Sequence, residues 1–343
     1  MIYNVQALRA LAALMVVVVH CRTVLAPDLG AWTECGRWGV DLFFVISGFI
    51  MIHTQTRRPL GASAFLLNRL VRVVPLYWSM TAVVFVVALS APHLFGATRA
   101  LTDEFVQSLL FIPFAKANGA IRPMLFVGWS LEYEMLFYLL FAAAIAMGAR
   151  RIEHVAGLVS VALASLCLAG LMGHPKSAPG IFFSSPMLLE FVWGMAVGLA
   201  VKRGWHVPAM LGLPLFLGCA AVMLTQHWLL SDMMRSPAAG LVTGLMLWTA
   251  ISMELQGGVV VRAARVQLMG TASYSLYLIH PFVIQGFAKI SDRVANAPVS
   301  VALTAIAVLV CVPCAVLCHR WLEVPLGSIM HAWLRPRFNA APA

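Results

Sequence analysis

Two ionisable side chains, Arg9 and His20, lie eleven residues apart in a segment whose other residues are mostly apolar. Eleven residues turn an α-helix by about 1100°, about 20° beyond three full turns, and rise about 16 Å, so both side chains share one helix face. A cation and a titratable imidazole on one face predict a polar channel inside a helical bundle, with His20 as a candidate general base. The alternative is that each side chain extends to the membrane interface nearest its own end of the helix.

Carboxylates that could orient this imidazole occur near the start of two later apolar segments. Asp41 is expected on the same side of the membrane as His20, and an Asp–His pair orients an imidazole and raises its basicity. Glu132 and Glu134 are two residues apart and therefore point in different directions on a helix. A carboxylate inside a dry helical bundle is a functional candidate, because its charge is expensive to bury. A carboxylate near the outer surface of the membrane has only a small desolvation cost and needs no function. The residues alone leave both interpretations open for this pair.

A pair of arginines, Arg69 and Arg72, precedes the third apolar segment. Residues three apart are neighbours on a helix, and paired guanidinium groups suit the oxygens of phosphate groups. Coenzyme A carries a pyrophosphate and a ribose phosphate, so this pair is a candidate site for its nucleotide end. The alternative is a topology anchor that holds the loop inside or contacts lipid head groups, and spacing alone favours that anchor.

Two further positions allow both a structural and a functional interpretation. Ser47 and Gly48 permit close helix packing or the close approach of a ligand; packing is favoured, and Ser47 is kept as a candidate cofactor-binding residue. His280 precedes Pro281, which should kink its helix. A structural interhelical hydrogen bond is favoured for His280 over a second catalytic imidazole.

Three of the seven cysteines lie on the last apolar segment beside His319. Their spacing is one that a soft metal site could use. No second cluster of ligands completes such a site, so we expect packing and no metal. The three are Cys311, Cys314 and Cys318.

The elements that position these residues are predicted to be membrane-spanning helices. The chain of 343 residues is 62% hydrophobic and 10% charged, with a mean hydropathy of +0.90, whereas soluble domains are about 25% charged. Lipid offers no partner to backbone polar groups, which favours helices, and the apolar runs do not alternate as barrel strands do. The sequence therefore predicts an all-α, polytopic membrane protein with about ten spans. They cover approximately 6–25, 37–54, 74–91, 128–149, 155–172, 186–201, 208–224, 237–253, 273–290 and 299–318.

The distribution of lysine and arginine predicts that both termini are cytoplasmic, because that side holds more of them. The short segment 103–114 is interpreted as interfacial, and the first apolar segment as a retained helix, since no small-residue cleavage site follows it. The formal charge of +10 suits an anionic membrane surface. No basic and aromatic stripe is present, so no nucleic-acid partner is expected.

Six segments, in this order along the chain, resemble the acyltransferase-3 family of integral membrane acyltransferases. The neighbourhood of Glu134 is similar to the branch that acetylates bacterial exopolysaccharide, such as succinoglycan. The six segments are Arg9 with His20, Gly39-Val40-Asp41-Leu42-Phe43-Phe44-Val45-Ile46-Ser47-Gly48-Phe49, Arg69-x-x-Arg72-x-x-Pro75, Trp129-Ser130-Leu131 with Glu134 and Phe137-Tyr138, Ser273-Tyr274-Ser275-Leu276-Tyr277-Leu278-Ile279-His280-Pro281, and Glu323-x-Pro325.

The resemblance implies a membrane domain over residues 1–325 with a short cytoplasmic tail, 326–343, in the bacterial inner membrane. It implies acyl-CoA, acetyl-CoA above all, as the donor, and a hydroxyl of a lipid-linked or polymeric carbohydrate as the acceptor. Membrane lipids and polysaccharide biosynthesis proteins are the other expected partners. The critical residues that it implies are Arg9, His20, Asp41 and Glu134 for catalysis, with Arg69 and Arg72 for the donor.

Two other classes of function remain open from the residues. Ten helices with intramembrane Arg, His and acids could form a proton-coupled secondary transporter of a glycan-related or small anionic substrate. Comparison of the halves 1–150 and 180–343 reveals no convincing repeat of the kind that many transporters have. A scaffold subunit of an export complex would leave the arginine pair and the grouping of His20 with acids unexplained.

Overall fold

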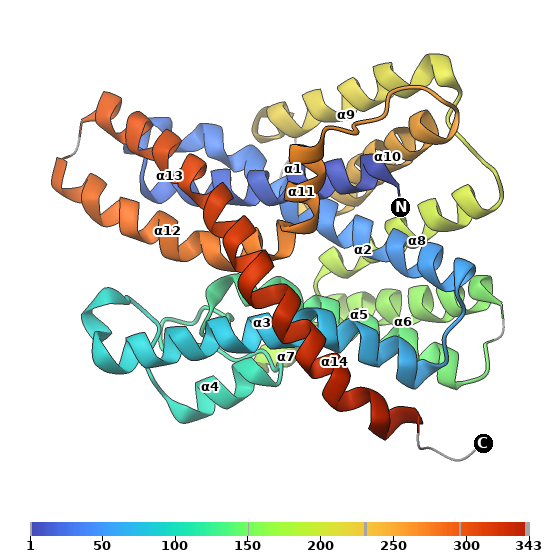
Figure 1. Ribbon diagram of the computed structural model, residues 1–343, viewed down its shortest axis with the longest axis horizontal. Coiled ribbons are helices and arrows are strands. Elements are labelled where there is room, and N and C mark those ends of the chain that lie inside the picture. The colour runs from blue at the N-terminus through green and yellow to red at the C-terminus, as the bar shows by residue number, and fades with distance from the viewer. Residues whose placement is uncertain (1, 150, 230–231, 295, 340–343) are drawn as a thin grey trace. The chain divides into compact units, whose positions relative to one another are not determined.

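The computed structural model describes residues 2–149, 151–229, 232–294 and 296–339, and these residues are almost entirely helical (Figure 1). Within them no strand forms, and the only extended pairing is an isolated bridge between Ala115 and Ile121. The prediction of an all-α, polytopic membrane protein is confirmed, because a chain this apolar satisfies its backbone groups inside helices.

Each of the ten predicted spans coincides with a helix. The ten helices are α1 (Tyr3–His20), α2 (Trp38–Arg57), α3 (Ala62–Ser90), α5 (Trp129–Ala146), α6 (Ile152–Gly173), α8 (Leu189–Lys202), α9 (Ala209–Leu229), α10 (Asp232–Leu255), α12 (Ser273–Val294) and α13 (Ala297–Cys318). Shorter helices are α4 (Thr102–Leu109) in the segment interpreted as interfacial, α7 (Ala178–Phe182) and α11 (Ala264–Thr271).

Seven segments in the described part of the chain are long and apolar enough to cross a membrane. Five of them contain α1, α2, α3, α5 and α6, and a sixth, Ala238–Leu255, covers most of α10. The seventh runs from α13 into the last helix, α14 (Val324–Asn339). The predicted spans at α8, α9 and α12 are not among them; α8, for example, has only 14 residues. The total number of crossings and the cytoplasmic position of the termini therefore stay predictions.

The helices form two compact units, each built from separate stretches of the chain. The first unit contains the described residues of 1–57 and 189–319, and the second contains those of 58–188 and 320–343. Residues 326–343, expected as a short tail, begin within α14, which packs against α3 in the second unit. Each unit is described separately below.

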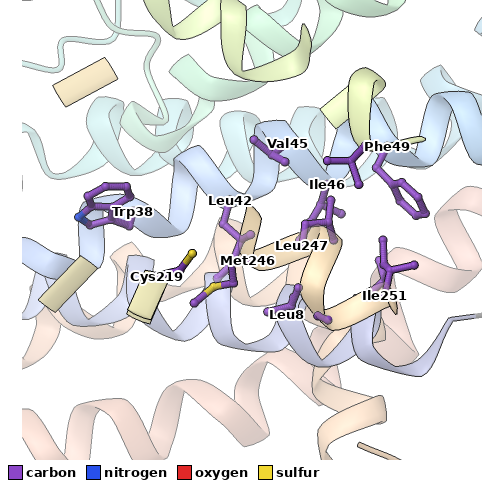
Figure 2. Close-up of a cluster of buried hydrophobic side chains, with 14 of the residues drawn as sticks. Leu8, Trp38, Leu42, Val45, Ile46, Phe49, Cys219, Met246, Leu247 and Ile251 are labelled. Carbon is purple, nitrogen blue, oxygen red and sulfur yellow. The ribbon is translucent and has the colours of Figure 1, made fainter. Parts of the chain in front are cut away.

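Helix α1 is held on two sides within the first unit. On one side it joins a buried cluster with α2, α9 and α10, in which Leu8 packs near Leu42 and Leu247 (Figure 2). On the other side Val17 packs in a second cluster, with residues of α12 and α13. The start of α1 is fixed by Glu254 of α10, whose carboxylate accepts hydrogen bonds from the first two amides of the helix at 2.9 and 2.7 Å. Helix α1, which carries Arg9 and His20, is therefore held at its start and in two apolar clusters.

Helices α2 and α8 cross at a contact that only glycine allows. A Cβ added to Gly48 would lie 2.2 Å from the carbonyl oxygen of Phe191, and one added to Gly194 would lie 2.0 Å from that of Val45. Both distances are far below van der Waals contact, so the two backbones touch directly. Small residues at such crossings let membrane helices pack closely, which confirms the packing interpretation for Gly48.

We expect Gly48→Ala to destabilise the protein by about 1–3 kcal/mol, because the added methyl group must push α8 away from α2. The matched control is Gly286→Ala on α12, where an added Cβ meets no atom within 4 Å. Thermal unfolding of both variants in detergent measures the difference. A melting temperature for Gly48→Ala equal to that of Gly286→Ala would contradict the close contact.

The second unit is organised around α3, which packs against α4, α5 and α14. Near one end of α3, Phe65 stacks on Phe141 of α5 with ring centroids 4.9 Å apart. Further along α3, the Tyr77 hydroxyl donates a hydrogen bond of 3.1 Å to the carbonyl oxygen of Ser108, in the last turn of α4. These contacts join α3 to both neighbours and thereby position the arginine pair that lies between them in sequence.

The short helix α4 carries a buried acid, Glu104, in the part of the second unit outside the predicted spans. Burial raises the pKa of the Glu104 carboxyl above its ordinary value of 4.5, and the Lys116 ammonium opposes this increase. Burial likewise lowers the pKa of Lys116, which donates a hydrogen bond of 2.7 Å to Thr98. The folded protein thus binds the Glu104 proton more tightly than the unfolded chain does.

Stability that depends on this proton is fully present below pH 4.5 and is lost as the pH rises through the folded-state pKa of Glu104. We expect Glu104→Gln to remove this loss, so that its melting temperature declines less than that of the wild type between pH 4.5 and 7. The control is the exposed neighbour, in the variant Asp103→Asn. Equal declines in the wild type and Glu104→Gln would show that Glu104 does not cause the pH dependence.

Candidate active site

Arg9 and His20 both contact helix α12 within the first unit. The Arg9 guanidinium donates hydrogen bonds to Gln6 Oε1 at 2.8 Å and to Ser273 Oγ at 3.0 Å, at the start of α12. His20 lies against His280, seven residues further along α12. Contact of both side chains with one neighbouring helix agrees with the shared face predicted for α1.

The His20 ring is half-buried at the end of α1. Its Nδ1 atom lies 2.7 Å from the Val16 carbonyl oxygen and 3.2 Å from His280 Nε2. His280 itself is fully buried, and its Nδ1 atom lies 3.1 Å from the Leu276 carbonyl oxygen. An imidazole held in this way has a defined orientation, as a general base requires.

Asp41 and Ser47 lie on α2, which packs against α1 in the same unit. Asp41 is in the first turn of α2 and is fully buried, and Ser47 is 8% exposed. The two helices approach closely at Gly39, where an added Cβ would lie 2.4 Å from the Ala12 carbonyl oxygen. A carboxylate buried in an apolar bundle is costly and is therefore a functional candidate. The pairing of Asp41 with His20 stays a prediction.

Arg69, Arg72 and Glu134 are brought together in the second unit. Arg69 is within electrostatic range of Arg72, Glu134 and Tyr138, and its guanidinium lies 5.6 Å from the centroid of the Phe65 ring. Glu134 in turn accepts a hydrogen bond from the Tyr138 hydroxyl one helical turn later. The half-buried Arg69 and the exposed Arg72 can bind an anion that approaches from the surface.

The two acids of α5 separate as their spacing predicts. Glu132 is fully buried, and neither of its carboxylate oxygens has a hydrogen-bond partner among the described residues. Glu134 is partly exposed and lies beside Arg69 and Tyr138. Glu134, and not Glu132, is therefore the acid of α5 that is within electrostatic range of Arg69.

Sequence reasoning missed two polar residues of the first unit. Ser273 binds Arg9, although the sequence analysis used it only as part of a motif. Glu190 is 1% exposed in the first turn of α8 and was not singled out. An acid inside a predicted apolar span was the signal that could have found Glu190.

The cysteines of α13 lie among apolar side chains. Cys311 packs with Cys21 and Ala307 in the cluster between α1 and α13, and the seven cysteines are free thiols. In the described part of the chain, no group of three or more His, Cys, Asp or Glu side chains could hold a metal ion. Packing is therefore the role that the structure assigns to Cys311.

Comparison with protein families connects this arrangement to a reaction class. The model of the acyltransferase-3 family, described as an acyltransferase domain, matches residues 2–317. The chain belongs to the acyltransferase-3 family. This membership decides between the functional classes that the residues left open: the protein is a multi-pass membrane acyltransferase, and the transporter and the scaffold are not supported.

Two curated proteins are similar to this acyltransferase. The exopolysaccharide production protein ExoZ of Rhizobium meliloti (strain 1021) is 35% identical over 271 residues, which cover 77% of this chain and 81% of ExoZ. The putative membrane-bound transacylase BcsY of Komagataeibacter xylinus is 26% identical over 220 residues, which cover 60% of this chain and 51% of BcsY. No solved structure matches the chain.

Proposed function

We propose that this acyltransferase transfers an acetyl or other short acyl group from acyl-CoA to a hydroxyl of a bacterial exopolysaccharide or its lipid-linked precursor, at the inner membrane. The observation that carries the proposal is the His20 imidazole, held by Val16 and His280 in a chain of this family. The similarity to ExoZ supports the choice of acceptor, since that protein takes part in exopolysaccharide production.

The donor is assigned to the arginine pair of the second unit. Coenzyme A carries its charge on phosphate groups, and two neighbouring guanidinium groups bind phosphate oxygens through charge-assisted hydrogen bonds. Arg72 is exposed and Arg69 is half-buried, which suits a ligand that enters from the surface. Glu134 is within electrostatic range of Arg69, and its carboxylate attracts the guanidinium group.

The transfer itself is assigned to His20. The imidazole takes the proton of the sugar hydroxyl as the oxygen attacks the thioester carbonyl carbon. The resulting tetrahedral intermediate then collapses, the C–S bond breaks, and the proton passes from His20 to the coenzyme A sulfur. Arg9 is proposed to steady the developing negative charge, and Asp41 to favour the protonated form of His20. In a variant of this route, His20 first accepts the acyl group covalently and then passes it to the sugar.

The test uses the purified protein in lipid nanodiscs with acetyl-CoA that carries one label on the acetyl group and a second on the adenine. Lipid-linked glycans of an exopolysaccharide-producing bacterium serve as acceptors. We expect the acetyl label alone to enter the glycan, with release of free coenzyme A. Transfer to water only, or glycan that stays unlabelled while acetyl-CoA binds, would overturn the proposed acceptor. Absence of acetyl-CoA binding would overturn the proposed donor.

A further inference from the structure

A second imidazole lies directly against His20 inside the first unit. The ring centroids of His20 and His280 are 4.9 Å apart and their planes are inclined by 49°. His280 has no exposed surface, whereas His20 is half-buried. The positions of the ring protons follow from the atoms around each nitrogen, because a carbonyl oxygen can only accept a hydrogen bond.

His20 must carry its proton on Nδ1. This atom lies 2.7 Å from the carbonyl oxygen of Val16, which can only accept, so Nδ1 is the donor. In a neutral imidazole the lone pair is then on Nε2. Nε2 is thus the nitrogen that can take a proton from a hydroxyl group.

His280 must carry its proton on Nδ1 as well. This atom lies 3.1 Å from the Leu276 carbonyl oxygen, which can only accept, so Nδ1 is the donor. The Leu276 carbonyl group therefore binds the Nδ1–H of His280, and in the neutral ring the lone pair is on Nε2.

The short contact between the rings is consistent with this assignment alone. His280 Nε2 lies 3.2 Å from His20 Nδ1, which is hydrogen-bond distance. With the lone pair on His280 Nε2, this atom accepts from the His20 Nδ1–H, which it shares with the Val16 carbonyl oxygen. A proton on His280 Nε2 would instead place two N–H groups against each other.

We propose that His280 is a positioning residue for acyl transfer: it accepts the Nδ1–H of His20 and holds the imidazole so that Nε2 is the base. This inference rests on the proposed role of His20. Val16 lies on the same helix as His20, so its carbonyl group selects the proton position but does not connect the ring to another helix. His280 joins the ring to α12, which also binds Arg9 through Ser273. One helix thereby aligns both of the α1 residues assigned to the reaction.

Three substitutions of His280 separate this role from simple packing. His280→Gln keeps an acceptor near the former Nε2, His280→Asn keeps only a donor near the former Nδ1, and His280→Leu removes both. We expect the Gln variant to retain kcat within about fivefold and the Asn and Leu variants to lose about 100-fold in kcat, with an unchanged KM for acyl-CoA. The exposed His93 provides the control, in the variant His93→Leu.

A purely structural role predicts a different pattern. The Asn variant would then recover activity as well as the Gln variant, or kcat would follow the melting temperature across all three variants. Either result would overturn the proposal. A kcat that falls in the Asn and Leu variants at equal amounts of folded protein, with recovery in the Gln variant, would support it.

A measurement without turnover distinguishes failure of this inference from failure of the proposed function. Solid-state nitrogen NMR spectra of histidine-labelled protein in lipid are recorded for the wild type and for His20→Ala. The signals that the variant loses belong to His20 and report which of its two nitrogens is protonated. We expect Nδ1 protonation; a signal from protonated Nε2 with unprotonated Nδ1 would overturn the positioning role, whether or not transfer occurs. Protonated Nδ1 in a protein that transfers no acyl group would instead refute the proposed function.

Discussion

His20→Ala is expected to lower the rate of acyl transfer by about 100- to 10,000-fold, the usual contribution of a positioned general base. The variant loses the Nε2 atom assigned to the hydroxyl proton, while α1 keeps its contacts with α2 and α10. The affinity for acyl-CoA should stay within about twofold, because the nucleotide is assigned to Arg69 and Arg72. The measurement combines single-turnover transfer of labelled acetyl with equilibrium binding of acetyl-CoA.

The control for this substitution is His154→Ala, which removes an exposed imidazole from the start of α6. Wild-type transfer by His154→Ala and its loss in His20→Ala would assign the effect to the site. Equal transfer by His20→Ala and the wild type would remove His20 from the mechanism and make Glu134 the next candidate base. Acyl protein that accumulates in the wild type and is absent from His20→Ala would support the covalent route.

Replacement of both Arg69 and Arg72 by alanine is expected to weaken acyl-CoA binding by about 100-fold or more, since each charge-assisted hydrogen bond contributes about 1.5–3 kcal/mol. Single changes to lysine keep the charge but lose the planar pair of donors, so we expect smaller losses of about tenfold. The effect should appear in the Kd, whereas the rate of transfer at saturating donor should change little.

Acetyl-pantetheine, which lacks the nucleotide and its phosphate groups, tests the assignment directly. If the two arginines bind phosphate, the double substitution should weaken acetyl-CoA binding and leave acetyl-pantetheine binding unchanged. Equal losses for both donors would mean that the pair supports the fold or the membrane topology. The exposed Arg58, close before the same helix, provides the control in the variant Arg58→Ala.

Much of the site can be derived from the sequence because it depends on helix periodicity. The spacing of Arg9 and His20 places them on one face of α1, and the structure confirms that both contact α12. The two-residue spacing of Glu132 and Glu134 predicts different directions, and one acid is buried while the other contacts Tyr138. Such local geometry follows from 3.6 residues per turn and requires no knowledge of the neighbouring helices.

Other features could not be derived from local patterns. The sequence favoured an interhelical hydrogen bond for His280, and the structure shows one, but its partner His20 is 260 residues away and was not predicted. The sequence also indicated a short tail after residue 325, where α14 packs along α3. In both cases the outcome depends on which helices become neighbours, and hydropathy carries no information about that choice.

The sequence by itself determined the class of the protein, its helical segments and the residue types available for acyl transfer, because composition and periodicity are local properties. It also carried the family membership, since the matching segments run in order along the chain. Only the tertiary structure decided which acid lies beside Arg69 and which group contacts His20. The contact of His20 with His280 joins helices that are 260 residues apart in sequence. Local patterns such as composition and periodicity do not show which distant helices become neighbours.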